Sequence, residues 1–300
     1  MTAAAPNADL GVGLGAGVDE RFGARLQAAV AERGPVVVGV DPHAALLEAW
    51  GLPDTPEGLR VFSRTVVEAA SGEVAAIKPQ SAFFERHGSA GVAVLEELLG
   101  SARERGLLTI LDVKRGDIGS TMGGYADAHL RAGAPLEADA ITASPYLGYG
   151  ALRPAIGLAA DHGKGVFVLA LTSNPDGAQV QHAREAEGTA VAARIIALAE
   201  ADGARERAQG ESGWGSVGLV IGATVGDALE RLGIDLSAGS APILAPGFGA
   251  QGAGPAERAA VFGAAAERVL VSVSRALLAA GPDPDSLRAA ARALRRDYAL

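Results

Sequence analysis

Eight short apolar runs, separated by longer stretches rich in Ala, Leu, Glu and Arg, constrain the fold of this chain more than any other feature. The runs are continuously apolar rather than alternating, as expected of strands buried on both faces of a parallel sheet. They cover residues 35–40, 74–77, 107–113, 138–143, 166–171, 217–221, 242–245 and 269–273. The intervening stretches, such as 57–71, 91–105 and 189–204, are long enough for crossover helices. Eight such units predict an α/β fold, a (β/α)8 TIM barrel rather than an open doubly wound sheet.

The length of the chain, 300 residues, could accommodate two domains, but α/β barrels often reach this length as one. No Gly/Pro-rich linker divides the sequence, so we expect a single (β/α)8 barrel domain over residues 19–300. Residues 1–18 are rich in Ala and Gly and lack the basic segment of a secretory signal, which predicts a flexible N-terminal tail. Residues 204–215, rich in Gly, Glu and Arg, predict an exposed loop.

Composition excludes several classes of function. A formal net charge of -9 argues against a nucleic-acid partner, which would require a basic stripe. No apolar run approaches the ~20 residues of a membrane span, so we expect no membrane association. The absence of cysteine removes disulfides, thiolate nucleophiles and Cys-ligated metals, and the five histidines have no metal-ligand spacing. We therefore expect a cytoplasmic protein without a metal site.

The most chemically informative segment follows the third apolar run and contains Asp112, Lys114 and Asp117. In an extended strand, side chains two positions apart share a face, so Asp112 and Lys114 are expected to lie side by side. Gly116 then ends the strand and lets Asp117 leave this face. Charges at the end of an apolar element are costly unless they are paired. The structural alternative is a salt-bridged strand end in which Asp117 caps the next helix.

Polar or glycine-rich residues also follow the other runs. Active sites of (β/α)8 barrels lie at the C-terminal ends of the strands, often with a phosphate site after strands 7 and 8. A Gly-rich loop exposes backbone N–H groups to phosphate oxygens, and a guanidinium can bind them bidentately. The residues at these ends are Asp41, Lys78, Thr172 and Ser173, the loop 246–252, and Ser274 with Arg275. They predict an active site that holds a phosphorylated substrate.

Taken together, these motifs resemble the orotidine 5′-phosphate decarboxylase family, specifically its type 2 subfamily, over about residues 21–300. The signature is Asp112-x-Lys114-x-x-Asp117-Ile118-Gly119. Motifs at residues 39–43, 77–80, 246–252 and 272–275 support it in the expected order. One departure is Ser274, because many members of the family have Gly before the arginine of the last motif.

The resemblance implies conversion of orotidine 5′-phosphate to uridine 5′-phosphate and CO2 in de novo pyrimidine biosynthesis, with no cofactor and no metal. It implies that Lys114 protonates C6 as CO2 leaves, that Asp112 lies against the substrate carboxylate, and that Lys78 extends the charged network. It also implies a homodimer in which Asp117 and Ile118 reach into the partner's site. The remaining substrate contacts that it implies involve Asp41, Ser173, Gln251, Gly252, Ser274 and Arg275.

The residue types suit this chemistry. Loss of CO2 from C6 leaves a carbanion in the plane of the ring, so that fixed charge has to supply most of the stabilisation. An ammonium at Lys114 can both oppose the negative charge and donate a proton, and a carboxylate beside it favours its charged form. Two alternatives remain open at this point. One is a relative that uses the same motif on a sugar phosphate with a divalent metal, and the other is an inactive barrel that only binds nucleotides.

Overall fold

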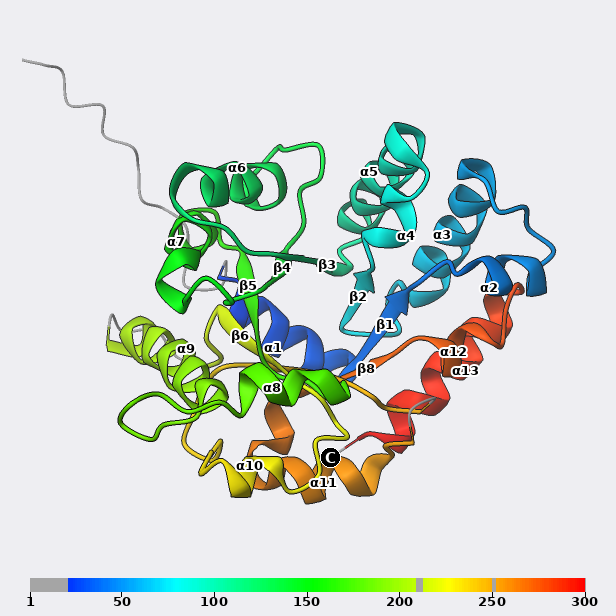
Figure 1. The fold of residues 1–300 in the computed structure, drawn as a ribbon. Coiled ribbons are helices and arrows are strands. Elements are labelled where there is room, and N and C mark those ends of the chain that lie inside the picture. Colours follow the sequence, from blue (N-terminus) through cyan, green and yellow to red (C-terminus); the bar gives the residue numbers. More distant parts are fainter. Residues whose placement is uncertain (1–20, 209–212, 250–251, 300) are drawn as a thin grey trace, which may run out of the picture.

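The computed structural model describes residues 21–208, 213–249 and 252–299, and within them eight parallel strands close into a barrel (Figure 1). The strands pair in chain order, and β8 pairs with β1 to complete the ring. They are β1 Val36–Val40, β2 Ala76–Pro79, β3 Leu108–Arg115, β4 Ala140–Ala143, β5 Gly165–Leu171, β6 Val217–Ile221, β7 Ile243–Pro246 and β8 Val269–Val273. The predicted (β/α)8 fold is confirmed, and each strand begins and ends close to its predicted run.

Helices surround the barrel (Figure 1). They are α1 Phe22–Arg33, α2 Ala44–Ala49, α3 Pro56–Ala70, α4 Ala82–Glu85, α5 Gly88–Glu104, α6 Gly119–Leu130, η2 Tyr149–Leu152, α7 Arg153–Asp161, η3 Pro175–Gly177, α8 Ala178–Gln181, α9 Val191–Ala208, α10 Ala228–Arg231, α11 Pro255–Phe262, η4 Gly263–Arg268, α12 Arg275–Leu278 and α13 Pro284–Asp297. The three predicted crossover helices correspond to α3, α5 and α9. The tail predicted over residues 1–18 lies outside the described residues.

The loop predicted from residue 204 is wrong in its first part, because α9 continues to Ala208. Residues 204–208 are Ala, Arg and Glu, which have high helix propensity. The Glu206 carboxylate also accepts a hydrogen bond from the backbone N–H of Ser216 and pairs with Arg21, which ties the end of the helix to the barrel. Residues 209–212 lie outside the described residues.

Local sequence explains why α3 begins and packs where it does. The Thr55 side chain caps the helix by accepting a hydrogen bond from the N–H of Gly58, and Pro56 occupies the first helical position. Leu59, Phe62 and Val66 recur at helical spacing and are buried, so this face packs against the barrel.

The barrel interior is filled with apolar side chains, and α1 covers its N-terminal end. Val36, Val38 and Val40 of β1 contact the outer helices, whereas Val37 points into the barrel. Phe22 of α1 packs edge-on against Phe167 of β5, with ring centroids 5.9 Å apart. Gly165 leaves room for this ring, because a Cβ there would lie 2.2 Å from Phe22. The filled N-terminal end leaves the C-terminal ends of the strands as the open side.

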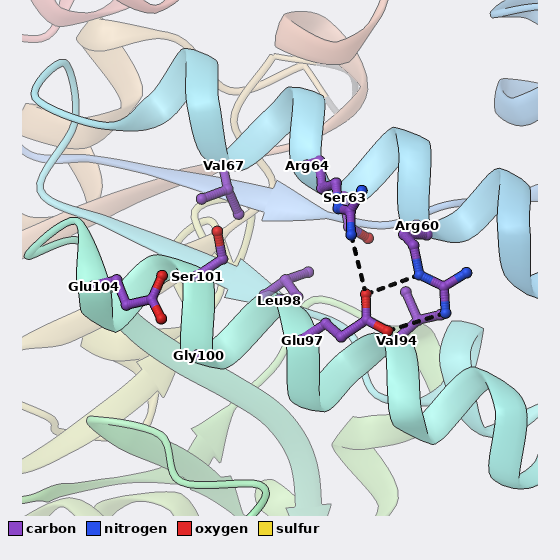
Figure 2. Close-up of a pocket in the computed structure, with 10 residues that line it drawn as sticks. All are labelled: Arg60, Ser63, Arg64, Val67, Val94, Glu97, Leu98, Gly100, Ser101 and Glu104. Carbon is purple, nitrogen blue, oxygen red and sulfur yellow. Dashed lines mark hydrogen bonds and ion pairs between the residues drawn. The ribbon is translucent and has the colours of Figure 1, made fainter.

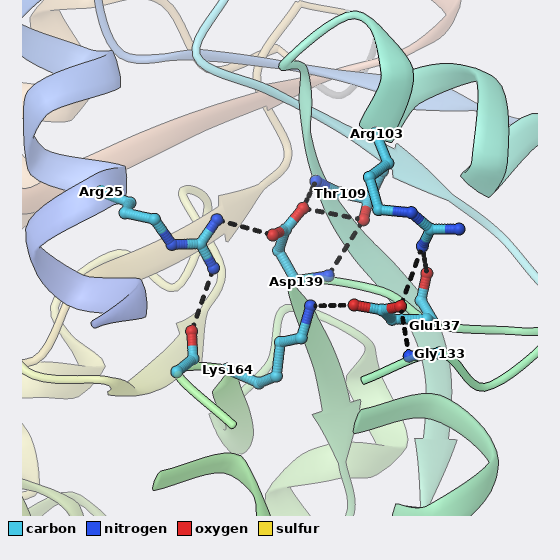
Figure 3. Close-up of polar contacts among 8 residues, drawn as sticks. Arg25, Arg103, Thr109, Gly133, Glu137, Asp139 and Lys164 are labelled. Carbon is cyan, nitrogen blue, oxygen red and sulfur yellow. Dashed lines mark hydrogen bonds and ion pairs between the residues drawn. The ribbon is translucent and has the colours of Figure 1, made fainter. Parts of the chain in front are cut away.

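Paired charges fix the same N-terminal end (Figure 3). The Arg25 guanidinium of α1 donates to Asp139 Oδ1 at 2.7 Å and to the backbone carbonyl of Gly163 at 3.0 Å. Nearby, Lys164 Nζ lies 2.6 Å from Glu137 Oε1. These contacts join α1 to the segments that lead into β4 and β5, and they stabilise the closed end of the barrel.

Candidate active site

A cavity of about 510 Å³ opens at the C-terminal ends of the strands, with every strand from β2 to β8 contributing to its wall. Its lining consists of Lys78, Asp112, Lys114, Thr142, Leu169, Thr172, Ser173, Asn174, Gln181, Val220, Leu244, Pro246 and Ser272. The predicted residues Lys78, Asp112, Lys114 and Ser173 are therefore brought together in one cavity.

Asp112 is the centre of a fully bonded charged cluster. Its side chain is only 8% exposed. Oδ2 accepts from Lys78 Nζ at 3.1 Å and from Gln80 Nε2 at 2.9 Å. Oδ1 accepts from Lys114 Nζ at 2.6 Å and from the Thr142 hydroxyl at 2.7 Å. This carboxylate is thus held in one orientation from four directions.

The cluster favours the charged forms of Asp112 and Lys78. Burial alone would raise the pKa of Asp112, but the ammonium groups of Lys78 and Lys114 and the hydrogen bonds to its oxygens lower it to about 2. Burial alone would lower the pKa of Lys78, but the negative charges of Asp112 and Asp41 outweigh it and raise that pKa. A carboxylate and an ammonium therefore stay ionised inside the barrel at neutral pH.

Lys114 reaches the cavity through an irregular backbone. Its φ is 45°, in the left-handed region that residues other than glycine rarely adopt. The pairing of β3 with β4 shifts register at the same place, between Leu111 and Arg115. The side chain is 48% exposed, unlike that of its partner Asp112. The two side chains lie side by side as expected, but a distorted strand brings them together rather than the regular alternation assumed from the sequence.

Lysine is rare in this chain. Only Lys78, Lys114 and Lys164 occur among its 26 basic residues, and the rest are arginine. Two of the three lysines contact Asp112, and the third pairs with Glu137 at the opposite end of the barrel. An arginine stays protonated at all ordinary pH values, whereas a lysine can give up a proton. The composition thus points to the same two residues as the geometry.

Asp41 and Ser274 directly follow β1 and β8, the first and last strands of the barrel, and neither is among the residues that line the cavity. A Cβ at Gly39 would lie 2.8 Å from Ser274 Cβ and 2.9 Å from Asp41 Oδ2, so glycine is needed for both side chains to approach. Asp41 Oδ1 and Ser274 Oγ are buried and have no hydrogen-bond partner among the residues that the structure describes. Their hydrogen-bonding capacity is therefore unused in this structure.

The glycine-rich loop after β7 lies beside Arg275. Gly247, Gly249 and Gly252 all have positive φ, and Gly249 donates its N–H to the carbonyl of Ala253. A Cβ on Gly249 would lie 3.0 Å from Ala276, the residue after Arg275. The Arg275 side chain is exposed. Of the predicted contacts in this loop, Gln251 lies outside the described residues.

The loop after β5 carries Ser173 and is held by a residue that the sequence did not reveal. Gln181 of α8 accepts from the backbone N–H of Thr172 at 2.8 Å and donates to its hydroxyl at 2.7 Å. Ser173 packs over Gly222, because a Cβ on Gly222 would lie 3.1 Å from the backbone nitrogen of Ser173. No sequence motif marks Gln181. Thr142 was also missed, although its position at the end of the fourth apolar run could have drawn attention to it.

Asp117 and Ile118 do not line the cavity of their own chain. Asp117 Oδ1 accepts a hydrogen bond from the N–H of Ile118, which itself occupies the N-cap position of α6. Asp117 therefore does not cap that helix, contrary to the structural alternative. The Ile118 side chain is 62% exposed, and Tyr146 and Leu147 on the neighbouring loop are 77% and 54% exposed. All three lie in the segments that follow β3 and β4, at the end of the barrel where the cavity opens.

The structure also bears on another cavity, a possible metal site and a possible membrane span. A cavity of about 400 Å³ lies between α3 and α5 on the outside of the barrel (Figure 2). Three of its charged side chains pair with one another, since Arg60 Nε lies 2.8 Å from Glu97 Oε2 and Arg64 lies 3.6 Å from the same oxygen. Among the described residues, no three His, Asp or Glu side chains gather to hold a metal ion. In the same ranges, no helix is both long and apolar enough to cross a membrane.

Comparisons with known proteins agree with the geometry. Residues 34–293 match the model of the orotidine 5′-phosphate decarboxylase / HUMPS family. The orotidine 5′-phosphate decarboxylase of Streptomyces coelicolor is 56% identical over 273 residues, 91% of this chain and 95% of the relative. A solved structure from Streptomyces avermitilis is 55% identical with a TM-score of 0.88, covering 93% of this chain and 94% of the other.

A more distant solved structure extends the comparison beyond bacteria. The OMP decarboxylase of Leishmania donovani is 32% identical with a TM-score of 0.70, covering 93% of this chain and 97% of that one. The family match spans most of the sequence, and the barrel and its charged strand ends lie within it. The chain therefore belongs to the orotidine 5′-phosphate decarboxylase family.

Proposed function

We propose that this protein decarboxylates orotidine 5′-phosphate to uridine 5′-phosphate in pyrimidine biosynthesis, with Lys114 as the proton donor. The observation that carries the proposal is the cluster of Lys78, Asp112 and Lys114 at the base of a cavity at the C-terminal strand ends. The identity to relatives named orotidine 5′-phosphate decarboxylase supports the same substrate.

In the proposed reaction, the bond between C6 and the carboxylate carbon breaks heterolytically, CO2 departs, and the electron pair stays on C6. The Lys114 ammonium opposes this negative charge as it develops and then transfers one proton from Nζ to C6. Water returns a proton to the lysine. Asp112, ionised in the cavity, faces the substrate carboxylate and favours its departure.

The remaining predicted residues serve binding in this proposal. Arg275 and the adjacent Gly-rich loop hold the phosphate, so that binding energy from a remote group keeps the carboxylate near Asp112. The unpartnered oxygens of Asp41 and Ser274 suit the ribose side of the cavity. The residues assigned to substrate binding are Asp41, Ile118, Ser173, Gln251, Gly252, Ser274 and Arg275.

We further propose a homodimer in which Asp117 and Ile118 complete the partner's site. The proposal is supported by the exposed apolar side chains of Ile118, Tyr146 and Leu147, because exposed apolar surface often marks an interaction site. A hydrogen bond from the N–H of Ser144 to the carbonyl of Arg115 holds the two loops of this surface together.

The domain and its location complete the proposal. We assign the barrel to one catalytic domain. We place the enzyme in the cytoplasm, since the lack of cysteine suits a reducing compartment.

A spectrophotometric assay tests the proposed function. The purified protein is given orotidine 5′-phosphate with and without EDTA, and the loss of the orotate absorbance is followed. We expect turnover that EDTA does not change. Turnover that EDTA abolishes would favour metal-dependent chemistry on a sugar phosphate, the first alternative. Binding of uridine 5′-phosphate without any turnover would indicate the second alternative, an inactive nucleotide-binding barrel.

A further inference from the structure

We propose that Thr142 is a positioning residue for the reaction, whose hydroxyl holds the Asp112 carboxylate and the Lys114 backbone in place at the same time. The inference rests on the proposed decarboxylation and assigns a role to a residue that neither the motifs nor the family signature includes. Thr142 lies on β4, is 2% exposed, and lines the cavity.

The two hydrogen bonds of this hydroxyl have fixed directions. Thr142 Oγ1 lies 3.0 Å from the backbone nitrogen of Lys114 and 2.7 Å from Asp112 Oδ1. A backbone N–H can only donate, so the hydroxyl oxygen accepts from Lys114. Its own hydrogen then points to Asp112, which as an ionised carboxylate can only accept. One hydroxyl thus connects the carboxylate with the backbone of the proton donor.

The pairing of β3 with β4 explains why this link is needed. Leu111 pairs with Ile141 and Arg115 pairs with Ala143, so residues 112–114 of β3 face the single residue Thr142 of β4. In this bulge, Lys114 adopts a φ of 45°, a conformation that persists in non-glycine residues only when the surroundings hold it. The bulge takes the N–H of Lys114 out of the regular ladder, and the Thr142 hydroxyl replaces the missing acceptor.

The same barrel contains a matched arrangement far from the cavity. Thr109 of β3 accepts a hydrogen bond from the backbone N–H of Asp139 at 3.0 Å and donates to Asp139 Oδ2 at 3.2 Å. It is also 2% exposed, and it lies in the charged network at the N-terminal end (Figure 3). Thr109 therefore provides a control with the same chemistry and burial but no access to the substrate.

The experiment compares Thr142→Val, Thr142→Ala, Thr142→Ser and Thr109→Val with the wild type. For each protein, kcat and KM for orotidine 5′-phosphate, Kd for uridine 5′-phosphate, and the melting temperature are measured. Removing the hydroxyl leaves a buried N–H unpaired, so we expect kcat to fall roughly 10- to 100-fold in Thr142→Val and Thr142→Ala. We expect KM and Kd to stay near the wild-type values, Thr142→Ser to retain most of the activity, and Thr109→Val to lose stability but not kcat.

Each other outcome contradicts the inference. Wild-type kcat in Thr142→Val or Thr142→Ala would overturn it, and so would an equal loss in Thr142→Ser, because that variant keeps the hydroxyl and the loss would then not follow the hydroxyl. If Thr142→Val does not fold, the Ala and Ser variants decide. If kcat falls as much in Thr109→Val as in Thr142→Val, both losses of activity would be explained by general destabilisation of the protein. Absence of turnover in the wild type would instead refute the proposed function, so the two failures are distinguishable.

Discussion

The Lys114 ammonium lies 2.6 Å from Asp112 Oδ1, and both side chains line the cavity, the lysine 48% exposed and the aspartate 8% exposed. The carboxylate is buried behind it and is held by three further donors. A substrate carboxylate that enters the cavity therefore meets a more exposed cation beside a buried anion. The proposed mechanism depends on this arrangement, because the fixed anion disfavours the bound carboxylate while the cation favours the carbanion.

The ionisation of Asp112 should make the stability of the protein depend on this residue at neutral pH. Its pKa is lowered from 3.8 to about 2 in the folded state. The ionised carboxylate therefore stabilises the fold at pH values above its pKa in the unfolded chain. That contribution, about 2 kcal/mol, is lost as pH falls through the folded pKa. We expect Asp112→Asn to lower the free energy of unfolding in urea by a constant amount between pH 8 and about pH 5, and by less below about pH 4.

The control for this prediction is Asp227→Asn, which removes an exposed carboxylate paired with Arg231 on α10. Surface pairs of this kind contribute little, so its stability should match the wild type. If the difference between Asp112→Asn and the wild type stays the same down to about pH 3, Asp112 does not have a lowered pKa.

Arg275 should contribute to binding only when the ligand carries a phosphate. We expect Arg275→Ala to weaken the binding of uridine 5′-phosphate roughly 10- to 100-fold, because a charge-assisted hydrogen bond to the phosphate is lost. The binding of uridine should be unchanged. Isothermal titration with both ligands measures the difference. Arg231→Ala removes an exposed guanidinium outside the cavity and should change neither affinity. Equal weakening of both ligands by Arg275→Ala would show that Arg275 does not contact the phosphate.

Asp117 should act in the partner's site if the proposed dimer forms. Lys114→Ala and Asp117→Asn are each expected to be inactive alone. On mixing, half of the dimers are hybrids, and one site in each hybrid is complete, so about a quarter of wild-type activity should return. Subunit exchange is verified with differently tagged chains. Exchange without recovered activity would place Asp117 in its own subunit's site.

The strand pattern could be predicted from the sequence because parallel strands buried on both faces are continuously apolar. The eight runs predicted both the barrel fold and the end of the barrel at which the active site lies, because the C-terminal ends of the strands meet on one side. This placed Asp41, Lys78, Asp112 and Arg275 on the same side of the barrel. The extent of α9 was not predicted, because Arg and Glu at 204–208 suit a helix as well as an exposed loop.

The bulge in β3 could not be predicted from the sequence, because it depends on how β3 pairs with β4. Regular alternation placed Lys114 beside Asp112 but gave no hint of its positive φ. Thr142 and Gln181 were missed for a related reason. Each acts by a hydrogen bond to a residue far along the chain or in an irregular loop, and neither carries a charge that would distinguish it in an apolar or turn segment.

The central claim is that Lys114 supplies the proton and the positive charge in the reaction, and the activity of Lys114→Ala tests it most directly. Its kcat for orotidine 5′-phosphate is measured beside its Kd for uridine 5′-phosphate, with Lys164→Ala, which removes a lysine paired at the other end of the barrel, as the control. The account predicts a loss of kcat greater than ~10³-fold in Lys114→Ala with nearly unchanged nucleotide affinity, and no such loss in Lys164→Ala. A kcat for Lys114→Ala within about tenfold of the wild type would contradict the account, because another group would then have to protonate C6.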